Sequence, residues 1–118
     1  MNIINLTPHE LTLVGNDGQV LARFPPSGQV LRLAEKTTSS TNFVHEGVEI
    51  PLLTKSVGAA EDLPPREEGT LYIVSLPVAL RYPERDDFVV PHDYVRDENG
   101  RVLGCRALAR VVEGEYDD

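Results

Sequence analysis

Short apolar runs separated by turn residues dominate the chain. Within these runs the spacing of apolar residues is closer to the two-residue period of a strand than to the 3.6-residue period of a helix. Residues 70–75 (TLYIVS) form the most continuous run, as expected of a central strand. No helical period persists for the length of an ordinary helix, but residues 76–82 can form a turn or two, with Ser75 as N-cap and Pro77 in the first turn. We therefore predict an α+β fold that is predominantly β: a mixed or antiparallel sheet with two β-hairpins and one short helix.

Two segments carry the signature of a β-hairpin. Residues 11–24 contain two apolar runs around 16–18 (NDG), and residues 94–108 contain two runs around 99–100 (NG). Asn, Asp and Gly tolerate the positive φ that tight turns require. Each segment is therefore predicted to pair antiparallel with itself.

The remaining segments are predicted from alternation and from turn residues. Strands are expected at residues 2–6, 30–33, 48–52 and 88–90, the last ended by Pro91. Two polar stretches are interpreted as loops, 36–47 and 59–69. The connection between 70–75 and 88–90 is barely long enough for a parallel crossover.

Size and charge limit the classes of function. The 118 residues fit one domain, predicted at 1–112, followed by an acidic tail at 113–118. The formal charge of −8 argues against general nucleic-acid binding, which requires a basic surface. Nine of the eleven basic residues are Arg, and only Lys36 and Lys55 are Lys. Arg suits bidentate recognition of phosphate or carboxylate, so a local anion site is one interpretation, and the base composition of the genome is the other.

The single cysteine and the absence of long apolar runs indicate a cytoplasmic protein. Cys105 cannot form an intramolecular disulfide or a cysteine zinc site, and it fits an alternating strand as a small core residue. No apolar stretch approaches the ~20 residues that span a bilayer, and the first residues do not resemble a signal peptide. A small domain leaves much surface exposed, so a homo-oligomer is possible.

Few motifs for chemistry occur. The sequence lacks a phosphate-binding Gly-rich loop, a GxSxG elbow, an HExxH helix and an EF-hand. The densest polar group, residues 81–87 (RYPERDD), follows the central strand, where sheets often hold anionic ligands. Ser75 could then offer a hydroxyl, and Arg81 or Arg85 a guanidinium. The alternative is a solvated turn with local Arg–Asp pairs.

Of the three histidines, only His9 is a candidate for chemistry. His9, beside Glu10, could act as a general base or could simply be a turn residue. His45 and His92 are expected to face solvent. The three histidines match no local metal-ligand spacing, so we predict no metal and no cofactor.

Several segments together resemble a family of small uncharacterised proteins of phages, prophages and bacteria. They are residues 4–9 (INLTPH), 25–28 (PPSG), 71–75 (LYIVS), the run with Arg85, Asp87 and Pro91, and 95–97 (VRD) through 104–105 (GC). The likeness spans nearly the whole chain. It implies a setting in which small accessory proteins interfere with host pathways, including nucleotide-signal defence, and it implies no catalytic residue.

We predict that the protein binds a small anionic metabolite, preferably a nucleotide, and in a phage setting sequesters a defence signal. The candidate contacts are His9, Ser27, Ser75, Arg81, Arg85, Asp87 and Arg96. Arg85 and Ser75 are expected to face one concavity. Two other classes stay open: a metal-independent phosphoester hydrolase or lyase, with His9 as base and Arg85 as charge stabiliser, and an acidic protein-interaction module.

Overall fold

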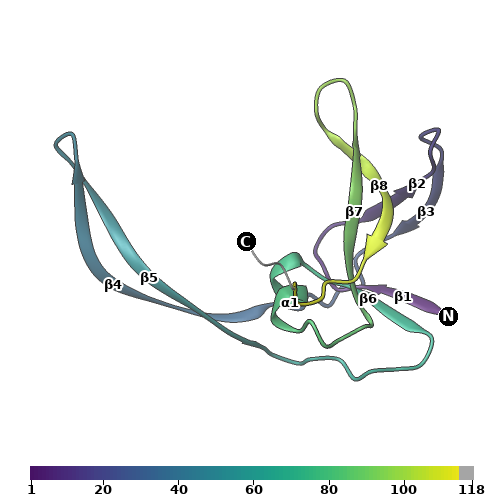
Figure 1. Cartoon of the computed structure of the whole chain (residues 1–118), viewed down its shortest axis with the longest axis horizontal. Coiled ribbons are helices and arrows are strands. Elements are labelled where there is room, and N and C mark those ends of the chain that lie inside the picture. Colours follow the sequence, from purple (N-terminus) through teal and green to yellow (C-terminus); the bar gives the residue numbers. More distant parts are fainter. Residues whose placement is uncertain (115–118) are drawn as a thin grey trace.

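The computed structural model describes residues 1–114 and shows a curved sheet from which one long hairpin projects (Figure 1). The elements in chain order are β1 (Asn2–Asn5), β2 (Leu11–Val14), β3 (Val20–Phe24), β4 (Leu33–His45), β5 (Val48–Ala60), β6 (Thr70–Ile73), α1 (Leu76–Arg81), β7 (Phe88–Arg96) and β8 (Val102–Ala109). The predicted fold class is confirmed. Residues 115–118 of the predicted acidic tail lie outside the described residues. No helix within residues 1–114 is long and apolar enough to cross a membrane.

Six strands form a mixed sheet in the order β1-β6-β7-β8-β2-β3. The first three are parallel to one another, and β8 and β3 each pair antiparallel with the strand that precedes them in the chain. Both predicted hairpins are present, and Gly18 and Gly100 adopt the positive φ expected of their turns. The helix α1 connects β6 to β7, so its six residues suffice for the parallel crossover.

Pro91 does not end a strand, which corrects the prediction from sequence. It lies inside β7, opposite Leu108 of β8. Val74 N donates to Val89 O, so the odd-numbered residues of β7 direct their backbone groups toward β6. Beyond Ile73 the chain has left β6 and entered α1, so no β6 residue lies beside Pro91. The missing N–H of proline therefore costs no hydrogen bond of the sheet.

The loop predicted at 36–47 is also wrong, because β4 and β5 form a third, much longer hairpin. The two strands pair from Leu33–Ala60 out to His45–Val48, and Glu46 and Gly47 make the turn with φ of 50° and 81°. Thr is a good strand former, and the Ser/Thr-rich composition of β4 is compatible with an exposed strand. The strand predicted at 30–33 begins only at its last residue, and the loop predicted at 59–69 begins only after Ala60.

The main core lies between α1 and one face of β6 and β7. The ring of Phe88 packs edge-on against the rings of Tyr72 and Tyr82, with centroids 6.1 and 6.2 Å apart. The buried cluster consists of Leu6, Leu31, Tyr72, Val74, Val78, Ala79 and Phe88. Cys105 lies outside the cluster but is fully buried, as predicted, and burial raises the pKa of its thiol.

The outermost strands of the sheet meet at one end through Asn5, which is buried. Its Nδ2 donates to Phe24 O (2.9 Å) at the end of β3 and to His9 O (2.8 Å). Its Oδ1 accepts from the backbone N–H and the hydroxyl of Thr7. One amide therefore joins the sheet edges and fixes the loop that follows β1.

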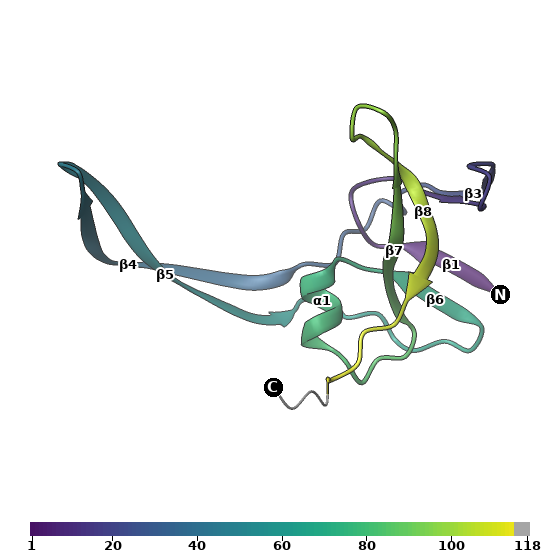
Figure 2. The same ribbon diagram turned by 45° about the horizontal axis from the view of Figure 1, so that its top comes forward.

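The β4–β5 hairpin, which we call the arm, gives the protein an extended shape (Figures 1 and 2). Every residue from 34 to 59 is exposed. The radius of gyration is 18.1 Å, whereas a compact chain of this length would have about 13.5 Å. The body and the arm are linked at the base by the Tyr82 hydroxyl, which accepts a hydrogen bond from Ala60 N (2.8 Å).

Candidate functional site

The loop after β1 and the start of α1 lie side by side, because the parallel strands β1 and β6 end at the same edge of the sheet. Ser75 is the N-cap of α1, but its side chain makes no capping hydrogen bond, so the hydroxyl faces outward. Two clefts border this point, and both are lined by Thr7, Pro8 and Ser75.

The first cleft, which we call the arm-base cleft, lies where the arm joins the body and has a volume of about 550 Å³. Its floor is apolar, formed by the buried side chains of Leu6, Leu31 and Val78. Its charged residues are Arg32, Glu35 and Lys55. Glu35 pairs with Lys55 at 3.2 Å, and within residues 1–114 Arg32 has no ion pair. The cleft therefore carries one uncompensated positive charge in a protein of net charge −8.

The second cleft, which we call the hairpin cleft, opens against the β7–β8 hairpin and has a volume of about 620 Å³. His9 and Glu10 lie at its rim, and within residues 1–114 no Lys or Arg lines it. Its exposed walls include the large side chains of Leu76, Tyr94, Val102 and Leu103. This cleft is therefore mainly apolar, and it offers an anion no guanidinium or ammonium group.

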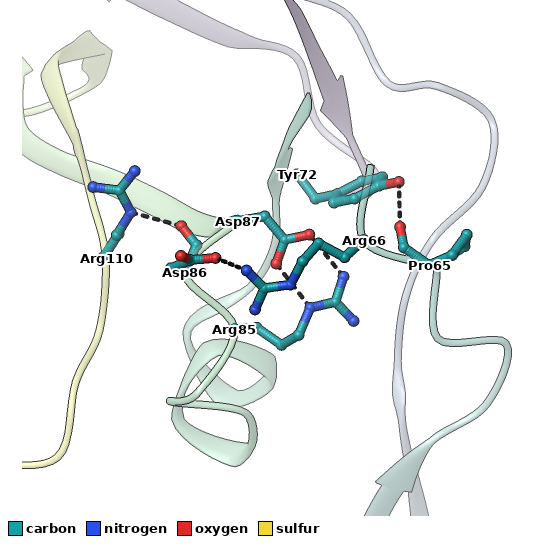
Figure 3. A network of polar contacts seen from close by, with 7 residues as sticks. All are labelled: Pro65, Arg66, Tyr72, Arg85, Asp86, Asp87 and Arg110. Atoms are coloured by element: carbon teal, nitrogen blue, oxygen red, sulfur yellow. Dashed lines mark hydrogen bonds and ion pairs between the residues drawn. The ribbon is translucent and has the colours of Figure 1, made fainter. Parts of the chain in front are cut away.

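Arg85 and Asp87 form a closed pair at the other end of β6 and β7 (Figure 3). Arg85 Nε donates to Asp87 Oδ1 (2.7 Å), and Arg85 Nη2 donates to Asp87 Oδ2 (2.8 Å). The two side chains are 12% and 7% exposed, and the guanidinium lies 4.3 Å from the centroid of the Phe88 ring. The hydrogen bonds from Arg85 lower the pKa of Asp87, and the carboxylate raises the pKa of Arg85.

The neighbouring polar contacts hold the surrounding loops together. Arg66 forms an ion pair with Asp86, whose backbone carbonyl accepts from Arg110 Nε at 2.6 Å (Figure 3). Tyr72 donates its hydroxyl hydrogen to Pro65 O (3.0 Å). Burial is the main cause that raises the pKa of Tyr72, and the charges of Glu67 and Asp87 raise it further.

A third cleft, of about 640 Å³, lies beside these contacts. Four carboxylates and two guanidinium groups line it: Arg66, Glu67, Glu68, Asp86, Asp87 and Arg110. Its net charge is negative, so it does not suit an anion.

The structure separates the residues predicted to share a site. Ser75 lines the arm-base and hairpin clefts, and His9 lines only the hairpin cleft. The expectation that Arg85 and Ser75 share one concavity is wrong. The physical reason is the parallel crossover. Ser75 follows the end of β6, whereas Arg85 precedes the start of β7, so α1 and the turn after it carry the chain from one end of these strands to the other.

The other predicted contacts are engaged in local interactions. Ser27 exchanges hydrogen bonds with the backbone of Gln29. Arg81 lies over the Tyr82 ring at 5.2 Å, and Arg96 donates to Gly100 O (2.9 Å) inside its own hairpin. Asp87 is occupied by Arg85, as described above.

No protein-family model, curated protein or solved structure matches the chain.

Sequence reasoning missed Arg32 and Lys55, the two cations of the arm-base cleft. They are separated by the length of the arm hairpin and come together only because β4 and β5 return to the same place. One signal was available: both lysines of the chain fall within the arm. Within residues 1–114, no group of three or more His, Cys, Asp or Glu side chains is placed to hold a metal ion.

Proposed function

We propose that the protein binds a small anionic ligand, a nucleotide, in the arm-base cleft. The observation that carries this proposal is the one uncompensated positive charge of that cleft, on Arg32, in a chain of net charge −8. The volume of about 550 Å³ falls in the range of small-molecule sites.

Each part of a nucleotide has a matching surface in the cleft. A guanidinium binds phosphate oxygens in a bidentate manner, so Arg32 is the main phosphate contact. Lys55 is paired with Glu35, so it adds ammonium donors but no net charge. The hydroxyl of Ser75, which makes no capping hydrogen bond, can donate to phosphate or ribose oxygens. The apolar floor at Leu31 and Val78 offers contact area for the base.

Binding without turnover is favoured over hydrolysis. A hydrolase using His9 as base and Arg85 as charge stabiliser needs both groups on one phosphate. Arg85 instead forms a closed pair with Asp87, at the end of β6 away from His9. In the phage-type setting that the sequence resemblance implies, a cytoplasmic binder of this kind would sequester a host nucleotide signal.

Calorimetric titration against a panel of nucleotides tests the proposal. Arg32→Ala should weaken binding of the best ligand by about 1.5–3 kcal/mol, the contribution of hydrogen bonds to a charged group. Arg101→Ala is the matched control, because Arg101 is also an exposed arginine but lies in the β7–β8 turn region, away from the cleft. Wild-type protein that binds no nucleotide, or equal affinity of the two variants, would refute the proposal. Native mass spectrometry of freshly purified protein would identify a co-purified ligand.

A further inference from the structure

The arm exposes apolar side chains that nothing in residues 1–114 covers. Seven of these side chains are between 41% and 62% exposed: Phe43, Val44, Val48, Ile50, Leu52, Leu53 and Val57. An isolated two-stranded hairpin is marginally stable in water, and continuous exposed apolar surface marks an interaction site. The arm therefore needs a partner surface.

The two faces of the arm differ in charge. On one face the strand pairs are His45–Val48, Phe43–Ile50, Thr41–Leu52, Thr38–Thr54 and, nearest the body, Lys36–Ser56. We call this the Phe43 face, and it holds no carboxylate. The opposite face holds Val44, Leu53 and Val57, but beside them it also holds the carboxylates of Glu35 and Glu49. The Phe43 face is therefore the one suited to burial.

We propose that the Phe43 face of the arm binds a second copy of this chain, with the two arms exchanged reciprocally. Two copies of net charge −8 repel each other, so they can associate only where carboxylates are scarce. Residues 33–60 contain three Glu and two Lys, a net charge of −1, so nearly all of the negative charge lies elsewhere. The arm meets this requirement of a self-association surface.

The size of the arm agrees with a stable dimer. A strand of 13 residues is about 43 Å long, and a two-stranded ribbon is about 10 Å wide with its side chains, so one face covers about 400 Å². In a twofold dimer, each copy buries the face of its own arm and the body surface beneath its partner's arm. The total of about 800 Å² per copy equals that of a standard protein interface.

The hairpin cleft is the surface that the arm of the second copy covers. It exposes the side chains of Leu76, Tyr94 and Leu103, and it lacks Lys and Arg among the described residues, so it matches the Phe43 face in polarity. The arm of the same chain projects away from the β7–β8 hairpin, which forms one wall of this cleft (Figures 1 and 2). The arm of its own chain therefore leaves this cleft open to the arm of another copy.

The oligomeric state tests the proposal directly. Sedimentation equilibrium across the micromolar range should give about twice the 13.0 kDa of the chain. Ile50→Lys should raise the dimer dissociation constant at least about a hundredfold, because it places an ammonium group in an apolar contact. Leu53→Lys is the matched control: Leu53 lies on the same strand and is similarly exposed, but it is on the opposite face. Both sites are exposed, so neither variant should impair folding.

A photo-crosslinker at Phe43 tests where the arm binds. Benzoylphenylalanine at this position should crosslink to side chains that line the hairpin cleft of the second copy, such as Leu76, Tyr94 and Leu103. A monomeric wild type would overturn the proposal, and so would equal effects of Ile50→Lys and Leu53→Lys. Crosslinks confined to residues 33–60 of the second copy would overturn the assignment of the hairpin cleft.

Discussion

Asp87→Asn is expected to destabilise the protein far more than the same change at its neighbour Asp86. The Arg85–Asp87 pair is nearly buried and bidentate. Asparagine keeps one acceptor for Arg85 but removes the charge and the second hydrogen bond. A hydrogen bond to a charged group contributes about 1.5–3 kcal/mol, and removing one partner of a fully buried pair costs about 3–5 kcal/mol. We expect a loss of about 2–3 kcal/mol in the free energy of unfolding.

Asp86→Asn provides the matched control. Its partner Arg66 and Asp86 itself are 54% and 69% exposed, and pairs of this kind contribute at most about 1 kcal/mol. Urea denaturation of wild type and both variants, at one salt concentration, gives the two differences. The double variant Arg85→Met with Asp87→Asn should lose less than the sum of the single changes, because it leaves no unpaired buried charge.

The pH dependence gives an independent check of the same pair. The folded pKa of Asp87 is lowered by its hydrogen bonds from Arg85. The pair therefore stabilises the fold fully above the unfolded pKa of Asp, about 3.9, and the stabilisation is lost as pH falls through the lower folded value. The difference between wild type and Asp87→Asn should shrink over that acid range. A difference that is the same at neutral and acid pH, or equal losses for the two Asn variants, would refute the reasoning.

Two further predictions concern β8. Gly104→Ala should destabilise the protein by about 2 kcal/mol or more, because a Cβ at this position would lie 2.5 Å from Thr12 O of the neighbouring strand β2. Thermal or urea denaturation measures the loss, and an unchanged midpoint would contradict the close approach. Cys105 is fully buried and its pKa is raised, so thiol labelling of the native protein should be slow and should accelerate on denaturation. Rapid native labelling would show instead that β8 is accessible.

Local chemistry explains which parts of the fold could be predicted from the sequence. The turns at Gly18 and Gly100 and the short helix after Ser75 depend on residues that lie within a few positions of one another. The arm was missed because β4 is polar and exposed on both faces, and the signals used for strands assume that one face is buried.

The candidate site was harder to predict, for a topological reason. The dense polar run at 81–87 follows the central strand in sequence, but α1 returns the chain to the opposite end of the sheet before Arg85. The cations of the arm-base cleft are brought together by the pairing of β4 with β5, and no short-range pattern contains that information.

The pairing of β1 with β6 has a consequence for how the chain acquires its structure during synthesis. Within residues 1–114, β6 is the only strand that pairs with β1, so Asn2 has no strand partner until Thr70 has been synthesised. The β2–β3 and β4–β5 hairpins have short-range contacts and can close while translation continues, whereas the parallel pairs require long-range loop closure and form later. The apolar residues of β1 are therefore unpaired for most of translation. If synthesis stopped before residue 70, the released chain could form the β2–β3 and β4–β5 hairpins but not the sheet that joins them. Synthesis of the β6–α1–β7 segment is therefore the step that commits the chain to its fold.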